Sequence, residues 1–169
     1  SKTRAELFDG SQLYLRFAMG SDEVQKILDK ISRIGHQLKD YATTNEGVHT
    51  GLDAVADKEI RKYPNKGYIK GEGVFVLPRG SYSFPHLRPW FKGSSISHCV
   101  AESDSKYEVL YWDNDTSPSD DELKHLEKFR IILEDRVAIK RAGRPWYQLN
   151  WPRKQEMFEG QKIVNPYRS

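Results

Sequence analysis

Apolar residues recur at three- and four-residue steps in two stretches of the chain, which predicts two amphipathic helices. The first stretch begins at Ser21, which is in position to cap a helix, and acidic residues follow in its first turn. Its apolar positions are Val24, Ile27, Leu28, Ile31, Ile34, Leu38 and Tyr41. The second stretch follows Ser119, and its apolar face consists of Leu123, Leu126, Phe129, Leu133 and Val137. Arg130 interrupts that face, but its long side chain can reach solvent.

Short runs typical of β-strands lie between and after these two stretches. They span residues 73–78, 106–112, 145–149 and 161–166. Because neighbouring strand residues point to opposite faces, we expect Trp146 or Tyr147 in the core, and a buried Ile163 beside an exposed Lys162. The order of helix, strands, helix and strands predicts an α+β fold with mostly antiparallel strands.

Length and composition indicate a single domain. The chain has 169 residues, of which 37% are apolar, enough for one core. The only cysteine, Cys99, cannot form an internal disulfide, so we expect a cytoplasmic protein, and no stretch approaches the roughly 18 apolar residues of a membrane span. We assign residues 21–169 to the domain and 1–20 to an N-terminal segment whose order the pattern does not determine. The start without methionine and the end at "KIVNPYRS" predict a fragment of a longer protein.

The sequence contains no complete catalytic, cofactor or metal motif. A methyltransferase would need a glycine-rich cofactor turn and an Asn-Pro-Pro-aromatic motif, whereas "NPY" at residues 165–167 has one proline and reads as a turn. The five histidines show no metal-ligand spacing. His98 beside Cys99 is interpreted as a surface histidine next to a buried cysteine. We therefore predict no catalytic residue, no cofactor and no metal in this chain.

Basic and aromatic residues concentrate near the carboxyl end. The stretch "AIKRAGRPWYQLNWPRK", residues 138–154, contains five Lys or Arg, two Trp and one Tyr, and no acid. The overall charge is only +3, yet residues 140–168 carry seven Lys or Arg against two Glu. Such a localised basic surface with aromatics is typical of polyanion binding. The alternative is a solvated surface whose acidic partners come from elsewhere in the fold.

The stretch "NEGVHTGLDAV", residues 45–55, places two glycines on either side of Val-His-Thr. This spacing favours a tight, exposed loop in which the backbone closely approaches a partner. An ordinary turn after the first helix is the alternative.

Five segments in order resemble the target-recognition domain of TaqI-like adenine methyltransferases and fused type II restriction–modification enzymes. "GVHTGLDAV" is similar to the family's G-I-x-T-G-x-D-x-V/F, "GEGVFVLP" to its GxGIFVL strand, and "LRPWFKGSSIS" to LKPxxKGxDI. "HLEKFRIILEDR" and "RPWYQLNWPRKQEMFEGQKIVNPYRS" resemble its last helix and its carboxyl-terminal segment. The likeness spans residues 27–169. Ala54-Val55 and "SHCV" depart from the pattern, at positions that bear on which base pairs are read.

The resemblance implies sequence-specific binding of double-stranded DNA. In such enzymes the methyltransferase domain holds S-adenosylmethionine and flips the adenine, while the recognition domain grips the duplex. For this chain, the resemblance implies that a catalytic domain and the S-adenosylmethionine site belong to the rest of the parent protein. It also implies that the parent is part of a prokaryotic restriction–modification system. The expected main DNA contacts are Arg141, Arg144, Arg153 and Lys154, and the secondary ones are His49, Thr50, Lys92 and His98.

One alternative function remains open on the sequence. The two amphipathic helices could dock against another protein, or against the rest of the parent chain, without any DNA contact.

Overall fold

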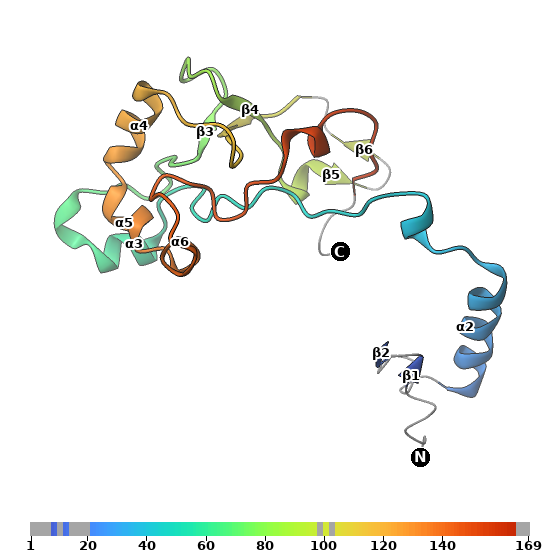
Figure 1. The fold of residues 1–169 in the computed structure, drawn as a ribbon. Coiled ribbons are helices and arrows are strands. Elements are labelled where there is room, and N and C mark those ends of the chain that lie inside the picture. The colour runs from blue at the N-terminus through green and yellow to red at the C-terminus, as the bar shows by residue number, and fades with distance from the viewer. Residues whose placement is uncertain (1–7, 10–11, 14–20, 98–99, 102–103, 165–169) are drawn as a thin grey trace. The chain divides into compact units, whose positions relative to one another are not determined.

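The computed structural model describes residues 8–9, 12–13, 21–97, 100–101 and 104–164. The chain divides into two compact units, residues 1–45 and 46–169, which are described separately (Figure 1). The division follows Asn45, whereas the sequence pattern placed the start of the domain at residue 21.

The first unit contains the first predicted helix in a shorter form. The strands β1 (Phe8–Asp9) and β2 (Gln12–Leu13) pair antiparallel, and the helix α2 (Asp22–Ile34) and the 3-10 helix η2 (Leu38–Asp40) follow. Ser21 caps α2 as predicted, because its Oγ accepts a hydrogen bond from the backbone of Val24 at 3.4 Å. The prediction that the helix continues to Tyr41 was wrong. It stops at Gly35, a poor helix former that turns the backbone into an extended conformation.

The apolar positions of α2 form an exposed stripe within the described residues. The side chains concerned are Val24, Ile27, Ile31 and Ile34, whose exposed fractions are 46, 60, 56 and 72%.

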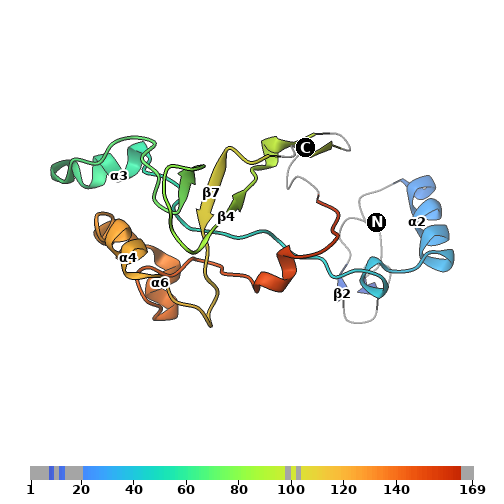
Figure 2. The ribbon, with the colours of Figure 1, turned by 90° about the horizontal axis from the view of Figure 1, so that it is seen from above.

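The second unit is built around a three-stranded antiparallel sheet. Its order is β3 (Val76–Pro78), β7 (Tyr107–Leu110) and β4 (Leu87–Trp90), with β7 in the centre. Figure 2 shows β7 beside β4. A separate two-stranded sheet pairs β5 (Ile96–Ser97) with β6 (Val100–Ala101). With its helices, this architecture confirms the predicted α+β class.

Short helices surround this sheet. They are α3 (Asp57–Lys62), η3 (Pro64–Lys66), η4 (Gly93–Ser95), α4 (Asp120–Glu127), α5 (Arg130–Glu134), α6 (Val137–Ala142) and η5 (Gln155–Phe158). The second predicted helix is therefore broken into α4, α5 and α6. The breaks fall at Phe129 and Arg136, where the backbone leaves the helical conformation and the side chains are 1% and 9% exposed.

The core lies between the sheet and the helices α4 and α5. Its most deeply buried members include Phe75, Leu77, Leu110, Trp112, Leu126, Phe129 and Leu133. Four of the five predicted apolar positions of the second helix are at least partly buried, but Val137 is 61% exposed because α6 starts a new direction.

Two predicted strands are absent from the described residues. Residues 145–149 form a turn, and residues 161–164 have no regular structure. Trp146 and Tyr147 still pack against the core, as expected. The prediction of a buried Ile163 was wrong, since this side chain is 99% exposed. Within the described residues no strand pairs with either run, so their β-propensity is not realised.

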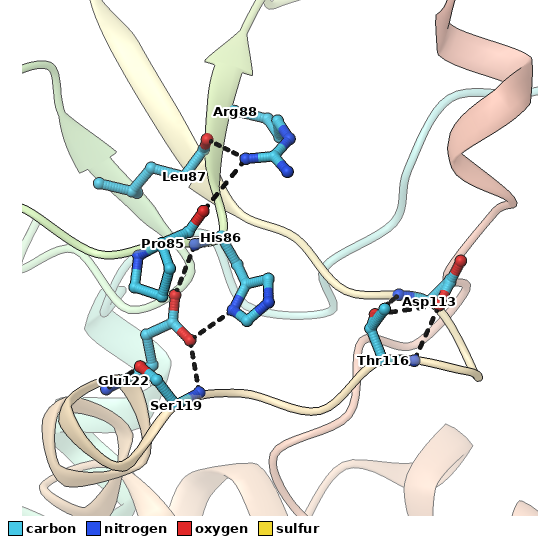
Figure 3. Close-up of polar contacts among 8 residues, drawn as sticks. All are labelled: Pro85, His86, Leu87, Arg88, Asp113, Thr116, Ser119 and Glu122. Carbon is cyan, nitrogen blue, oxygen red and sulfur yellow. Dashed lines mark hydrogen bonds and ion pairs between the residues drawn. The ribbon is translucent and has the colours of Figure 1, made fainter.

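A polar cluster connects the start of β4 to the start of α4 (Figure 3). Glu122 is fully buried, and its carboxylate accepts hydrogen bonds from the backbone of His86 at 2.9 Å and of Ser119 at 2.7 Å. The ring of His86 lies 2.8 Å from the same carboxylate through Nδ1. Ser119 and Glu122 also form the capping box of α4. This cluster fixes the backbone that enters β4.

Candidate nucleic-acid interface

Parts of the two segments marked by the sequence, 45–55 and 138–154, lie side by side at His49–Thr50 and Asn150–Trp151. The backbone N–H of Trp151 donates to the carbonyl of His49 at 3.0 Å, and that of Asn150 donates to Thr50 at 3.3 Å. Both views show the extended chain before α3 running along the segment that precedes η5 (Figures 1 and 2). The "VHTG" loop and the basic-aromatic stretch therefore contribute to one surface, which we call the paired-segment surface (residues 46–51 and 144–154).

Gly51 allows these segments to meet. Its backbone has φ +85°, and a Cβ at this position would lie 2.3–2.5 Å from the side-chain atoms of Asn150. The expected close approach of the glycine backbone to a partner is real, but the partner is a residue of the same chain.

Thr50 shapes the loop from inside. It is 3% exposed, its hydroxyl donates to Asp53, and its Oγ1 accepts from the backbone of Leu52 at 3.2 Å. This side chain is held within the loop, so any contribution to a DNA contact comes through the conformation of its neighbours.

Arg136 connects the two segments to the α5–α6 junction. Its Nη1 donates to the carbonyl of Thr50 at 2.8 Å and to Oδ1 of Asn150 at 3.3 Å. Its Nη2 donates to the carbonyls of Trp146 at 2.7 Å and Gln148 at 2.8 Å. Its Nε donates to Leu133 at 3.1 Å. One planar guanidinium thus holds three parts of the chain in register.

The charge of Arg136 persists despite its burial. The guanidinium lies 5.2 Å from the centroid of the Phe75 ring, and no carboxylate pairs with it among the described residues. Burial lowers its pKa to about 10, which leaves it protonated at neutral pH. Carbonyl dipoles and an aromatic face stabilise this cation in place of an anion.

Three of the four predicted main contacts are exposed. Arg141 lies in the last turn of α6, Arg144 follows it, and Lys154 precedes η5. Nη1 of Arg144 donates to the carbonyl of Asn150 at 3.1 Å, which holds this arginine against the paired segment. No described carboxylate forms an ion pair with any of these three.

Arg153 and His49 share an acidic partner. Glu46 lies 3.6 Å from Nη2 of Arg153 and 3.6 Å from Nε2 of His49. The guanidinium of Arg153 is also 5.8 Å from the centroid of the Trp151 ring, and Trp151 is 57% exposed. Arg153 and the exposed ring of Trp151 therefore lie together on the surface. The carboxylate of Glu46 would compete with any other anion for Arg153.

Lys140 forms an ion pair on the surface of the protein with Asp135. Its Nζ donates to Asp135 at 2.7 Å, and Lys62 binds the other oxygen of the same carboxylate. Hydrogen bonds from Lys140 and then Lys62 hold the pKa of Asp135 well below its usual range. Of the five basic residues in 138–154, Lys140 and Arg153 therefore have an acidic partner in their own fold.

The remaining predicted contacts do not join the paired segments. Lys92 follows β4, and its Nζ lies 4.9 Å above the ring of Tyr107. His98 and Cys99 lie outside the described residues.

An open groove of about 440 Å³ borders the loop. The loop residues from Val48 to Ala54 form one wall, and Lys58, Glu59 and Trp90 complete it. Among the described residues there is no group of three or more potential metal ligands, and no helix there is long and apolar enough to cross a membrane.

Sequence reasoning missed the role of Arg136. The signal available was an arginine three residues after the apolar run of residues 131–133, at the end of the helix-like segment "HLEKFRIILEDR". The five acceptors of its side chain could not be read from the sequence because they belong to separate parts of the chain.

No protein-family model and no curated protein sequence matches the chain.

Proposed function

We propose that this chain is the DNA target-recognition domain of an adenine-specific methyltransferase or of a fused type II restriction–modification enzyme. The observation that supports the proposal best is the meeting of residues 46–51 with residues 144–154, which brings exposed cations and an exposed tryptophan together. Double-stranded DNA is the polyanion that such a surface fits.

The predicted contacts and Arg136 take different roles in this proposal. Arg141, Arg144 and Lys154 neutralise phosphates and so set affinity and its salt dependence. Trp151 contacts sugar or base with its exposed face. Thr50 and Arg136 hold the loop in shape, and Lys92 and His98 remain secondary contacts.

Glu46 adds a competition that DNA has to overcome. In the free protein this carboxylate lies 3.6 Å from both Arg153 and His49. A DNA phosphate also carries a full negative charge, so it can replace Glu46 as the partner of Arg153. The carboxylate of Glu46 is then hydrated. The pair is partly exposed, and surface ion pairs are worth only about 0–1 kcal/mol, so its exchange costs little stability.

The proposal assigns chemistry to the parent protein and none to this chain. A catalytic domain in the same parent would bind S-adenosylmethionine and carry out methyl transfer, in the cytoplasm of a prokaryote. The recognition domain would position the duplex for that reaction.

Fluorescence anisotropy with duplex DNA tests the proposal. Arg144→Ala/Arg153→Ala should weaken binding, and the slope of log K against log salt should become less negative by about 0.9 for each phosphate that the variant no longer neutralises. A matched double variant, Lys66→Ala/Lys124→Ala, removes the same charge outside the two segments and should bind as the wild type does, apart from a small general effect. Equal weakening in both variants would show that net charge alone matters and would refute the assigned surface.

A second function is favoured by one specific observation, the exposed apolar stripe of α2. Contiguous exposed apolar surface of this kind marks protein contacts. In this alternative the helix docks on another protein or on the catalytic domain. Ile27→Glu/Ile31→Glu would then abolish association with this partner and leave DNA binding unchanged. Arg144→Ala/Arg153→Ala would weaken DNA binding and leave the association unchanged.

A further inference from the structure

Arg88, in β4, is an exposed arginine whose orientation is fixed by its own backbone surroundings. Its Nη1 donates to the carbonyl of Leu87 at 2.8 Å and to the carbonyl of Pro85 at 3.3 Å (Figure 3). Both hydrogens of Nη1 are thereby used. The opposite edge of the guanidinium, formed by Nε and Nη2, has no hydrogen bond or ion pair with any described residue.

The carbonyls that hold Arg88 are themselves anchored in the core. His86, between Pro85 and Leu87, donates its backbone N–H to the buried Glu122 at 2.9 Å, and its ring contacts the same carboxylate at 2.8 Å. Leu87 is paired with Leu110 in the sheet. The buried carboxylate of Glu122 thus holds His86, and His86 holds the two neighbouring carbonyls that bind Arg88. These contacts fix the Nε and Nη2 edge of Arg88 before any ligand binds.

Arg88 also lies close to the basic-aromatic segment. The backbone of Tyr111 donates to His86 at 3.0 Å, and its hydroxyl donates to the carbonyl of Arg153. Burial raises the pKa of the Tyr111 hydroxyl, and the nearby charge of Arg88 acts in the opposite direction. One tyrosine thus joins the start of β4 to the residues around Arg153.

A fixed guanidinium with one free edge has a specific use on DNA. Ordering a long side chain on binding costs about 0.5–1.5 kcal/mol, and this cost is already met in the free protein. Two parallel N–H groups match the O6 and N7 acceptors of guanine, which is the commonest specific contact in the major groove. A phosphate contact, by comparison, needs no such fixed plane.

We propose that Arg88 reads a guanine, with its Nε and Nη2 edge donating to O6 and N7. This inference rests on the proposed function, because it names a base that the DNA-binding surface recognises. Arg88 was not among the contacts expected from the sequence, where it is part of "LRPWFKG".

The experiment begins with selection of duplexes from a random library by the whole chain. Each guanine of the enriched sequence is then replaced, one at a time, by 7-deazaguanine, which lacks the N7 acceptor and keeps O6. Wild type should bind about 5- to 10-fold more weakly at one guanine, a part of the 5- to 150-fold expected for a complete bidentate contact. Arg88→Ala should bind the natural sequence more weakly and show no further weakening at that guanine.

Two control variants make the result specific. Arg88→Met keeps an unbranched stem but has no donor, so it should also be insensitive to 7-deazaguanine. Arg61→Ala removes an exposed arginine of α3 and should keep the full wild-type penalty. Far-ultraviolet circular dichroism confirms that the Arg88 variants fold, and Arg88→Met carries the test alone if Arg88→Ala does not.

The possible outcomes separate the two proposals. If the whole chain enriches no sequence and binds no duplex, the proposed function fails and this inference fails with it. If a sequence is enriched but contains no guanine, or if the Arg88 variants keep the same penalty at every guanine, the function stands and the assignment of Arg88 is overturned.

Discussion

At the scale of single residues, Arg136 shows how a cation can organise a surface that it does not itself occupy. It is 9% exposed, and its five hydrogen bonds end on four carbonyls and one side-chain oxygen. The carbonyl of Thr50 also accepts from the backbone of Asn150, whereas the carbonyls of Trp146 and Gln148 are both held by Nη2 of this one side chain. The loop at Thr50 and the turn at residues 146–150 therefore share a single support.

Replacement of this arginine by lysine should be costly. The ammonium of Arg136→Lys cannot reach acceptors in three chain segments, and we expect at least two carbonyls to lose their donor at about 1–3 kcal/mol each, or roughly 2–6 kcal/mol of unfolding free energy. Urea unfolding followed by tryptophan fluorescence measures this. Arg141→Lys, at an exposed position, should stay within about 0.5 kcal/mol of wild type. Similar stability of the two variants would contradict the role given to Arg136.

Gly51 offers a second prediction at this scale. In Gly51→Ala the new Cβ would displace the side chain of Asn150, which accepts from Arg136 at 3.3 Å, and the backbone would be strained at φ +85°. Gly67→Ala is the matched control, since φ is +66° there and no atom lies within 4 Å of the added Cβ. Gly51→Ala should lower the free energy of unfolding by about 1–3 kcal/mol more than Gly67→Ala does. Thermal unfolding should therefore show a larger fall in Tm for Gly51→Ala. Equal falls would mean that the contact with Asn150 is easily relieved.

At the scale of elements, the start of α4 and the start of β4 are joined through one buried carboxylate (Figure 3). Glu122 completes the capping box with Ser119 and also receives the backbone and ring of His86. Removing it would release a helix end and a strand end together. The sheet and the helices on its core side are therefore coupled at a polar point as well as by apolar packing.

This coupling predicts a defined pH dependence. Burial by itself raises the pKa of Glu122, but the hydrogen bonds from His86 and Ser119 outweigh it, so the pKa of the folded state lies below the usual 4.5. As the pH falls, Glu122 is protonated in the unfolded chain before it is protonated in the folded chain. The stability that this carboxylate contributes is therefore complete above about pH 4.5 and is lost as the pH falls through the folded-state pKa. Glu122→Gln should cost about 1–3 kcal/mol at pH 7, and the difference from wild type should shrink in acid. Urea unfolding at pH 7 and at stepwise lower pH measures it, and a constant difference would refute the assignment.

At the scale of the whole molecule, the residues of the paired-segment surface and the main core belong to the unit 46–169. The apolar stripe of α2 belongs to the other unit, residues 1–45. The two candidate functions therefore lie on different units and can be separated by truncation.

Residues 46–169 alone should fold and should bind duplex DNA as the whole chain does. The reason is that every hydrogen bond described for the surface is made inside this unit. Circular dichroism should show a cooperative thermal transition, and anisotropy should give an affinity within about threefold of the whole chain, a difference of roughly 0.6 kcal/mol. A folded truncation that no longer binds duplex would place the contact in residues 1–45.

The α+β class, the cap at Ser119 and the apolar face of α2 could be predicted because each depends on residues close together in the sequence or on the order of such patterns. Local pattern also identified the two segments of the candidate surface, but not how they are held. The prediction of a buried Ile163 failed for the same reason. Apolar residues that favour strands form a buried strand only when another strand pairs with them, and residues 161–164 have no such partner among the described elements.

The sequence by itself determined where helices could begin, which residues were apolar and where basic charge was concentrated. Only the tertiary structure decided that the long second helix breaks at Phe129 and Arg136, that Asp135 pairs with Lys140, and that Glu46 competes for Arg153. The physical reason is distance along the chain. A cap or an apolar stripe is set by residues up to four apart, whereas the carbonyl that anchors Arg136 belongs to a residue 86 positions away, and no local pattern records that contact.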